Sequence, residues 1–367
     1  MRQMKSKNVL ELCLSPDLGG LELYMMRAAK VLSRTFNVIS VINKNGKLED
    51  YYKETAHRYE LLSKKSNLFM FSAANRLAKI IDENKIEVVH LHWTKDLPIA
   101  VLAKYLSKQN PKLVQTRNMN MTRFKDDFYH RLLYKNIEMM LPVTKRVAKQ
   151  LEKFIPERVR PKIEVLYMGT PKVSTLSEEE TTLFRKEHGM DECFAVGMVG
   201  RIEEHKGQHL LIEAIEKLEG IELFFVGHEM KEGYIEELKV LAEKRGLSKR
   251  VHFLGFMKNP MHFMQTCDAM ILATPCETFG LVVIEAMSVG TPMIATRACG
   301  PMEIITDETD GLLFNDQDVT ELSEKIHRLY SDKKFANELS CNAQKTVEKR
   351  FDTEKQFDKL AKVLGSL

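Results

Sequence analysis

The chain has 367 residues, more than one typical domain, and its 44% apolar and 29% charged residues are ordinary for a globular protein. Its net charge of +4 hides an asymmetry, because residues 1–172 hold 32 basic and 17 acidic residues while the remainder is acidic overall. No apolar run reaches the roughly 20 residues of a membrane-spanning helix, so we exclude such a helix and expect a cytoplasmic protein whose basic half meets an anionic partner.

Short apolar runs and longer amphipathic segments alternate through the first half of the chain. The runs predict strands at Val9–Leu14, Phe36–Ile42, Glu87–Leu91, Lys112–Gln115, Met139–Pro142 and Ile163–Leu166. Helical periodicity lies between them, at Leu21–Leu32, Leu68–Ile81, Asp96–Leu106 and Val143–Phe154. This alternation predicts a parallel sheet that is covered by helices on both faces.

The alternation stops near residue 170 and then begins again. Gly169-Thr170-Pro171 contains two turn formers, and the segment Ser174–Glu180 is polar, which is typical of a connection between domains. We therefore expect an N-terminal domain at residues 1–170 and a C-terminal domain at residues 171–350. A closing helix at residues 351–367 is expected to pack back toward the first domain.

The second half repeats the pattern of the first. Strands are expected at Phe194–Val199, Glu222–Val226, Val251–Phe253, Ala269–Ala273 and Pro292–Ala295. Helices are expected at His209–Leu218, Gly233–Lys244, Leu281–Val289, Val319–Tyr330, Phe335–Val347 and Thr353–Leu364. The predicted fold class is α/β, with two doubly wound, Rossmann-like domains that face each other across a cleft. Because ligands bind at the carboxyl ends of parallel strands, this cleft is the expected binding site.

Two glutamates flank a glycine at the start of an expected helix, in the segment Glu277-Thr278-Phe279-Gly280-Leu281-Val282-Val283-Ile284-Glu285. Gly280 allows a tight turn, and the N–H groups that follow lack helical partners, so they can bind phosphate or sugar oxygens. The carboxylate of Glu277 can accept hydrogen bonds from sugar hydroxyls, and that of Glu285 can accept those of a ribose. Acidic residues also occur near helix N-termini without a ligand, because the helix dipole favours them there.

A second glycine loop follows the strand expected to end at Val199, with the sequence Gly200-Arg201-Ile202-Glu203-Glu204-His205-Lys206-Gly207. Arg201 and Lys206 supply two cations, which suits a diphosphate, since each charge-assisted hydrogen bond contributes about 1.5–3 kcal/mol. A solvated basic loop is the alternative. A third loop, Asp17-Leu18-Gly19-Gly20-Leu21-Glu22, lacks the glycine order of nicotinamide sites but can still face a phosphate.

Together these segments resemble glycosyltransferase family 4, a large family of retaining enzymes with the GT-B fold. The resemblance covers nearly the whole chain and is most specific in the second half. The family's motifs occur there in order, as Gly200-Arg201 to Lys206-Gly207, Val226-Gly227, Leu254-Gly255-Phe256, Glu277 to Glu285-Ala286-Met287, Gly290-Thr291-Pro292 and Asp310-Gly311-Leu312-Leu313. The resemblance implies a UDP- or GDP-sugar donor on the C-terminal domain and an acceptor on the N-terminal domain.

The resemblance also implies a role for each motif residue. Glu277 would contact the donor sugar, Arg201 and Lys206 would hold the diphosphate, and Glu285 would bind the ribose. The remaining donor contacts would come from the backbone amides of Phe279, Gly280 and Leu281, from Phe256 and Met257 beside the base, and from Gly20 at the phosphates.

One position departs from the family pattern. Many members have a histidine shortly after the strand that ends near Thr116, close to the reacting carbon, and this chain has Asn118 there. Asn118 can hydrogen-bond a sugar hydroxyl. Arg117, beside it, can meet a phosphate of the acceptor.

Two further motifs have competing interpretations. In His90-Leu91-His92-Trp93, strand alternation places both histidines on one face, where His92 or Trp93 could contact an acceptor or simply pack. A metal site would need further ligands. Asp316-Gln317-Asp318 precedes a helix, so we expect a helix cap there rather than a metal site. Six cysteines, none in a Cys-x-x-Cys pair, are expected to be reduced thiols: Cys13, Cys193, Cys267, Cys276, Cys299 and Cys341.

The stretch Lys145–Lys162 holds seven basic residues against two acidic ones, and with Arg117, Arg123 and Lys125 it predicts a basic face. No nucleic-acid-binding signature accompanies it, so no nucleic-acid partner is expected. An anionic membrane surface or a phosphorylated, lipid-linked acceptor fits the charge better, and a solvated surface is the alternative. Leu68–Phe71 is expected to pack in the core or to touch lipid.

The function favoured by these features is retaining transfer of a sugar to a lipopolysaccharide, O-antigen or capsule acceptor. No metal or cofactor is expected, because cations and a helix N-terminus already neutralise the leaving diphosphate. The segment Thr116–Thr122 offers no base for an inverting reaction. Asp126 and Asp127 beyond it are either such a base or the start of a helix. The alternatives are a sugar phosphorylase or nucleotide-sugar epimerase on the same fold, or a catalytically silent sugar-nucleotide-binding subunit.

Overall fold

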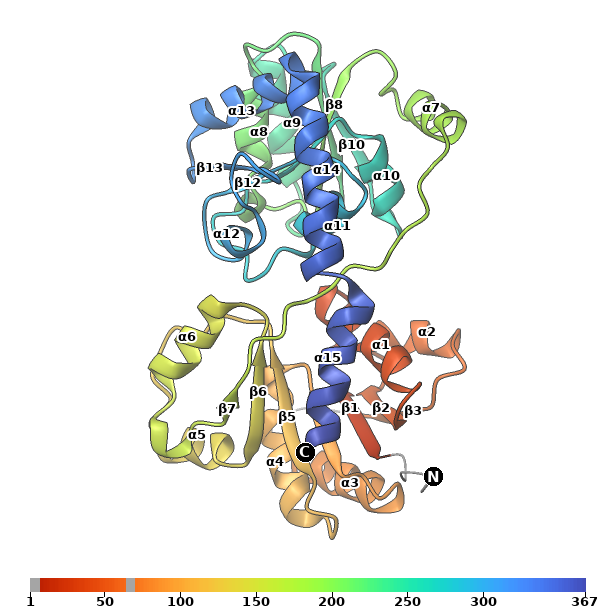
Figure 1. Ribbon diagram of the computed structural model, residues 1–367, viewed down its shortest axis with the longest axis vertical. Helices are drawn as coiled ribbons and strands as arrows, with labels where there is room; N and C mark the ends of the chain where they lie inside the picture. The colour runs from red at the N-terminus through yellow and green to blue at the C-terminus, as the bar shows by residue number, and fades with distance from the viewer. Residues whose placement is uncertain (1–6, 64–69) are drawn as a thin grey trace. The chain divides into compact units, whose positions relative to one another are not determined.

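The computed structural model describes residues 7–63 and 70–367, which form two units (Figure 1). Residues 1–168 and 354–367 belong to the first unit, and residues 169–353 form the second. The chain therefore returns to the first unit for its last helix. Within the described residues, no helix is both long and apolar enough to cross a membrane.

A parallel sheet with the strand order β3-β2-β1-β4-β5-β6-β7 forms the centre of the first unit. Its strands are β1 (Asn8–Cys13), β2 (Asn37–Asn43), β3 (Tyr59–Leu62), β4 (Val88–Leu91), β5 (Lys112–Arg117), β6 (Ile137–Pro142) and β7 (Lys162–Ile163). The order reverses between β1 and β4. The carboxyl ends of these two strands are therefore the topological switch point of the unit, where ligands bind in such folds.

Helices connect these strands and cover the sheet. They are α1 (Gly20–Leu32), α2 (Leu48–Lys53), α3 (Met70–Glu83), α4 (Leu97–Leu106), α5 (Phe128–Tyr134), α6 (Lys145–Phe154) and α15 (Thr353–Ser366). Leu10 and Leu12 of β1 belong to a core cluster with residues of α3 and α4, whereas Cys13 belongs to a second cluster with Met25 of α1. Both faces of the sheet are thus buried.

The second unit has a parallel sheet with the equivalent order, β10-β9-β8-β11-β12-β13. Its strands are β8 (Phe194–Val199), β9 (Ile221–Val226), β10 (Val251–Gly255), β11 (Ala269–Leu272), β12 (Met293–Thr296) and β13 (Leu312–Phe314). Its helices are α7 (Glu178–Glu187), α8 (Gln208–Ala214), α9 (Tyr234–Lys244), α10 (Pro260–Thr266), α11 (Leu281–Ser288), α12 (Pro301–Ile304), α13 (Val319–Ser331) and α14 (Lys333–Arg350). The switch point lies between β8 and β11.

The structure confirms the α/β fold class expected from the sequence. Each expected strand and helix overlaps an observed element, although Leu68 and Phe69 lie outside the described residues. Strands β3 and β13 were not expected from the sequence. Asp318 caps α13 by accepting a hydrogen bond from the Glu321 N–H at 2.9 Å, which confirms the expected helix cap.

The polar connection expected at Ser174–Glu180 is only partly a loop, because α7 begins within it. The Ser177 hydroxyl accepts a hydrogen bond from the Glu180 N–H, and the Glu180 carboxylate accepts one from the Ser177 N–H. This is a capping box, whose Ser-x-x-Glu signature is visible in the sequence. Polar composition alone therefore does not distinguish a linker from a helix that begins with a capping box.

Candidate functional site

Two of the predicted loops meet at the switch point of the second unit. The loop that begins at Gly200 follows β8, the loop that begins at Thr274 follows β11, and these strands are neighbours. Lys206 Nζ donates a hydrogen bond to Glu277 Oε2 at 2.9 Å, which joins the two loops. The Lys206 side chain is 16% exposed and that of Glu277 is 32% exposed, so a ligand can reach this ion pair from solvent.

The second predicted cation, Arg201, lies in the same loop as Lys206. Its side chain is half exposed and pairs with Glu203 at 2.9 Å. Exposed ion pairs contribute little to stability, so an anionic ligand can replace the carboxylate at small cost. Both predicted cations therefore belong to pairs that a diphosphate could take over.

Glycines allow the two loops to pack closely at this place. Gly207 has a φ of 78°, and a Cβ atom there would lie 2.6 Å from the carbonyl oxygen of Ala273, just after β11. Gly280 has a φ of 99° and directly precedes α11. Both conformations are left-handed, a region that residues with side chains rarely adopt. The backbone path of each loop thus requires glycine.

The start of α11 is fixed from its buried side. Phe279 is buried and its ring packs against Phe351, with ring centroids 5.9 Å apart. The Gly300 N–H donates a hydrogen bond to the Glu277 carbonyl at 2.9 Å. The first residues of α11, from Leu281 onward, have backbone N–H groups without partners inside the helix. This end of the helix is therefore a rigid set of donors for anionic oxygens.

The other predicted donor residues lie on the same unit. Glu285 is half-buried in the second turn of α11. Phe256 and Met257 follow β10, the edge strand, and the exposed Phe256 ring lies 6.2 Å from that of His228. The residues assigned to phosphate, sugar and ribose thus lie on the β8 and β11 loops and on α11, and those assigned to the base lie at another strand end.

Cys276 and Cys299 form a disulfide, so the expectation that all six cysteines are reduced thiols was wrong. Both residues lie just beyond the carboxyl ends of β11 and β12, which are neighbouring parallel strands. They are 23 positions apart in the sequence, and only the pairing of the strands brings them together. The other cysteines are unpaired thiols: Cys13, Cys193, Cys267 and Cys341.

Gly20 and Asn118, the two site residues predicted in the first half, both lie in the first unit. Gly20 is exposed at the start of α1, which follows the β1 loop at the switch point. Asn118 follows β5, and its Oδ1 is buried without a hydrogen-bond donor among the described residues. An unsatisfied buried oxygen is unfavourable by about 1–3 kcal/mol, so a donor such as a sugar hydroxyl would stabilise this side chain.

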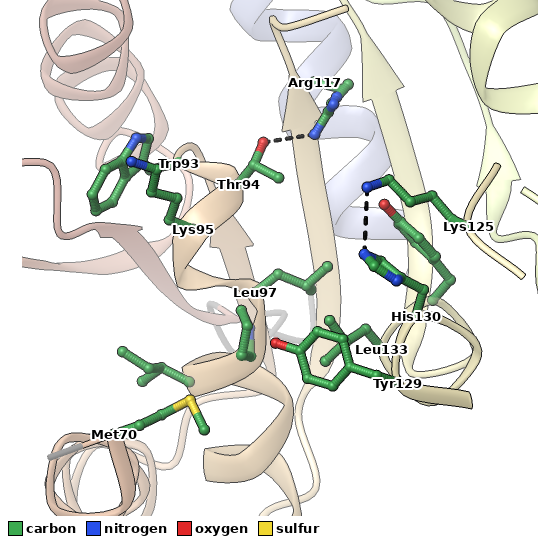
Figure 2. Close-up of a pocket in the computed structure, with 13 residues that line it drawn as sticks. Met70, Trp93, Thr94, Lys95, Leu97, Arg117, Lys125, Tyr129, His130 and Leu133 are labelled. Atoms are coloured by element: carbon green, nitrogen blue, oxygen red, sulfur yellow. Dashed lines mark hydrogen bonds between the residues drawn. The ribbon is translucent and has the colours of Figure 1, made fainter. Parts of the chain in front are cut away.

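A cavity of about 550 Å³ lies beside the carboxyl ends of β4 and β5 (Figure 2). Its walls come from α3, the β4–α4 connection with the start of α4, the end of β5, and α5 with the loop before it. The lining residues are Met70, Trp93, Thr94, Lys95, Leu97, Pro98, Ile99, Arg117, Lys125, Tyr129, His130, Leu133 and Tyr134. Trp93 and Arg117 were proposed from the sequence as acceptor contacts. The α5 residues were not. Asp127 caps α5 by accepting a hydrogen bond from the His130 N–H at 3.1 Å, which is the helix-start role considered for it from the sequence.

His90 and His92 share one face of the sheet, as expected, but both are buried around Glu11 of β1. Glu11 Oε2 lies 3.0 Å from His90 Nδ1 and 2.5 Å from His92 Nε2. Burial raises the pKa of Glu11, but the charges and hydrogen bonds of His90 and His92 outweigh it and lower this pKa to about 2. His92 is therefore packed in the interior, which was the alternative to an acceptor contact, and Trp93 packs partly against both core clusters of the first unit.

Two family models match the chain, and each lies mainly in one unit. The model for glycosyl transferases group 1 matches residues 180–346, and the model for glycosyl transferase 4-like proteins matches residues 11–150. The second half therefore matches a family model over the loops that hold Arg201, Lys206 and Glu277.

Curated relatives include enzymes of surface-polysaccharide synthesis. The chain is 29% identical over 168 residues to the lipopolysaccharide core biosynthesis glycosyltransferase LpsE of Rhizobium meliloti, which covers 46% of this chain and 48% of LpsE. It is 23% identical over 339 residues to the capsular polysaccharide biosynthesis glycosyltransferase CapM of Staphylococcus aureus, which covers 88% of each. The chain thus spans about half the length of LpsE and most of CapM.

The fold is also that of a crystallised protein. The crystal structure of Anabaena HepE in complex with UDP and glucose superposes with a TM-score of 0.86 at 22% identity, covering 98% of this chain and 99% of HepE. This similarity shows the GT-B fold that the sequence resemblance implied.

Proposed function

Because the chain belongs to glycosyltransferase family 4, we propose that it transfers a sugar from a nucleotide-diphosphate donor to a cell-surface glycan acceptor. The observation that supports this most directly is the Lys206–Glu277 pair at the switch point of the second unit. It places a cation suited to a diphosphate beside a carboxylate suited to sugar hydroxyls. The relatives in lipopolysaccharide core and capsule synthesis support a surface glycan as the product.

The donor would be held by the second unit. Arg201 and Lys206 would bind the diphosphate by charge-assisted hydrogen bonds, together with the amides of Phe279, Gly280 and Leu281. Glu277 would accept hydrogen bonds from the sugar. HepE was crystallised with UDP and with UDP-glucose. Of the two donor types considered, UDP-sugars and GDP-sugars, this supports a UDP-sugar.

The nucleoside and the acceptor side involve the remaining predicted residues. Glu285 would accept hydrogen bonds from the ribose hydroxyls, and Phe256 with Met257 would contact the base. Gly20 would approach the phosphates with its backbone, since it has no side chain to prevent this. Asn118 would hydrogen-bond a sugar hydroxyl in place of the histidine found in many family members.

The reaction would retain the anomeric configuration. The bond between the anomeric carbon and the leaving phosphate oxygen breaks, and the acceptor oxygen bonds to the same face of that carbon. The acceptor proton passes to the leaving phosphate oxygen, so no protein base is needed. Arg201 and Lys206 stabilise the charge that develops on the diphosphate, and Glu277 holds the sugar in position without attacking it.

Donor binding and product analysis test this function. A panel of UDP-, GDP- and ADP-sugars is screened for thermal stabilisation, which should reach about 2.7 kcal/mol at a hundredfold excess over Kd. Proton NMR of the product from an α-linked donor should then show an α-linkage. A β-linked product would contradict retention. Transfer to phosphate would indicate a phosphorylase, and absence of any turnover would indicate a silent binding subunit.

The basic first half would attach the protein to an anionic membrane surface. Each Lys or Arg close to such a surface contributes about 1 kcal/mol, and salt weakens this attraction. In flotation with vesicles containing anionic lipid, the protein should float at low salt and remain at the bottom at high salt. Neutral vesicles serve as the control. A protein that does not bind anionic vesicles even at low salt would point to a water-soluble acceptor.

A further inference from the structure

Arg117 is a buried cation whose hydrogen-bond partners are all neutral. It ends β5 and is 6% exposed. Its Nη1 donates to Thr94 Oγ1 at 2.7 Å, its Nε to the Met119 carbonyl at 2.8 Å, and its Nη2 to the Asn120 carbonyl at 3.1 Å. Among the described residues, no carboxylate forms an ion pair with this guanidinium.

A guanidinium keeps its proton even when it is buried, so its charge must be balanced in another way. A buried charge without a counter-ion is unfavourable, and an anionic ligand would remove that penalty. Three of the five N–H groups of Arg117 are used in the bonds described. The two that remain, one on each terminal nitrogen, are available to an anion in the adjoining cavity.

A second cationic group lines the same cavity. Lys125 Nζ lies 3.4 Å from His130 Nε2. Burial, together with the charges of Arg123 and Arg117, lowers the pKa of Lys125, although the charge of Asp127 opposes this. Asp127 interacts with the other ring nitrogen of His130, Nδ1, at 2.5 Å. The carboxylate therefore orients the imidazole and leaves Nε2 facing Lys125.

The opposite end of the cavity is apolar. Figure 2 shows Arg117 and Thr94 at one end and Met70, Leu97 and Leu133 at the other, with Tyr129 beside Leu133. A volume of about 550 Å³ is far more than a phosphate ion needs and is within the range of pockets for larger organic ligands. The cavity thus has room for a charged group and an apolar segment at once.

Three exposed aromatic residues lie next to lining residues in the sequence. Phe71, Phe124 and Phe128 each adjoin a lining residue in the sequence, and they are 64%, 66% and 81% exposed. Large exposed apolar side chains beside a pocket are typical of surfaces that an apolar ligand or a lipid covers. An acceptor with a long apolar part would have contacts outside the cavity as well as within it.

We propose that this cavity binds the acceptor, and that the acceptor is an amphiphile with a phosphate group next to an apolar segment. The identification of the ligand as the acceptor rests on the proposed transferase function. The phosphate binds Arg117 and Lys125, and the apolar segment lies along Met70, Leu97 and Leu133. Phosphate fits better than a carboxylate, because its additional oxygens and greater charge can serve both cations together.

Calorimetric titration of the full chain, without any donor, tests this binding. The probes are dodecyl phosphate below its micelle concentration, inorganic phosphate, and dodecyl maltoside as an uncharged amphiphile. Dodecyl phosphate should bind at least about tenfold more tightly than either other probe, because it alone uses both ends of the cavity.

Substitutions locate the site. Arg117→Gln and Lys125→Ala should each weaken dodecyl phosphate binding by about tenfold, through loss of a charge-assisted bond. Lys108→Ala, at an exposed lysine of the first unit that does not line the cavity, should leave binding unchanged. Thermal unfolding checks that each variant is folded. Lys125 is only partly buried, so its variant provides the test even if Arg117→Gln does not fold.

Three results would overturn the proposal. If dodecyl phosphate and dodecyl maltoside bind equally tightly, the phosphate group does not contribute to binding. If inorganic phosphate binds as tightly as dodecyl phosphate, the apolar segment does not contribute. Unchanged affinity in both cavity variants would place the ligand elsewhere. Failure of the transferase function would appear separately, as absence of product from every nucleotide sugar while dodecyl phosphate still binds.

Discussion

The two units have equivalent strand orders, but the charged side chains near the switch point are accessible in the second unit and buried in the first. In the second unit, Lys206 and Glu277 form a simple pair that solvent can reach. In the first unit, Glu11, His90 and His92 form a closed network on the two central strands and are fully buried. An accessible pair can exchange partners with a ligand, whereas a buried network cannot, because removing one member leaves the others unpaired.

This difference explains at which strand ends each unit has charged side chains that are available to bind a ligand. In the second unit, the switch point itself supplies the cation and the carboxylate. In the first unit, the buried carboxylate of Glu11 is already engaged by His90 and His92 beside the switch point. The charged group that is available to a ligand is the guanidinium of Arg117, one strand further along at the end of β5, where the cavity is found. The same topology therefore presents its ligand-binding groups at different strand ends.

Removing the buried carboxylate should produce the largest effect. Glu11→Ala leaves both histidines without their shared acceptor, and we expect a loss of about 3–5 kcal/mol in the free energy of unfolding. Urea unfolding followed by circular dichroism measures it. Glu60→Ala, which breaks the exposed pair with Arg76, is the matched control and should change stability by less than about 1 kcal/mol. Equal losses of stability in the two variants would contradict the idea that the buried network stabilises the fold more than an exposed ion pair does.

The pH dependence of stability should come from the same network. Burial and the neighbouring His90 lower the pKa of His92 to about 4, although its hydrogen bond to Glu11 opposes this. The unfolded chain therefore binds more protons than the folded one below about pH 6.5, the ordinary pKa of histidine. Stability should fall as the pH decreases from 6.5 toward 4, by about 3 kcal/mol for His92 alone.

Glu11 extends this acid sensitivity. Because its folded pKa is lowered, its contribution is present above its ordinary pKa of 4.5 and is lost as the pH falls toward 2. Unfolding free energies of the wild type and of His92→Gln, measured between pH 4 and 7, separate the two groups. The variant should have the shallower slope over this range. Parallel slopes would show that His92 does not titrate differently in the folded state.

At the exchangeable pair, the effect should be on ligand binding rather than on folding. Lys206→Ala and Arg201→Ala should each weaken UDP or GDP binding by about 1.5–3 kcal/mol, with little change in stability. Lys244→Ala, at an exposed lysine of α9, is the control. Calorimetric titration measures the affinities. Unchanged affinity in both site variants would show that this loop does not bind the diphosphate.

The donor loops and the sheets could be predicted because both depend on local sequence. Apolar runs of β8 and β11 end in glycine-containing loops, and the family resemblance assigns Lys206 and Glu277 to one site. Their 2.9 Å contact then follows from the strand order, since β8 and β11 are neighbours.

Features that depend on register and burial could not be predicted in this way. The partnership of Glu11 with His90 requires the alignment of β1 with β4, which pairs these two residues directly. The Cys276–Cys299 disulfide likewise requires the pairing of β11 with β12. The sequence marked Arg117 as a cation near the acceptor, but its burial among neutral partners depends on how the loop after β5 folds back over it.

Removal of divalent metals should have the smallest effect, because the proposed phosphate site already contains the positive charge it needs. Arg201, Lys206 and the N-terminal amides of α11 would neutralise the leaving diphosphate. EDTA should therefore change the transfer rate by less than about twofold, a negligible barrier difference. Loss of transfer with EDTA, restored by magnesium or manganese, would contradict this assignment.

The same treatment probes the first unit, where the ligand-type atoms of Glu11, His90 and His92 lie within 4.8 Å of one another. Since both histidines already contact the Glu11 carboxylate, EDTA should also leave the unfolding temperature unchanged. A lower unfolding temperature would show that a bound ion, rather than hydrogen bonding, holds this network together.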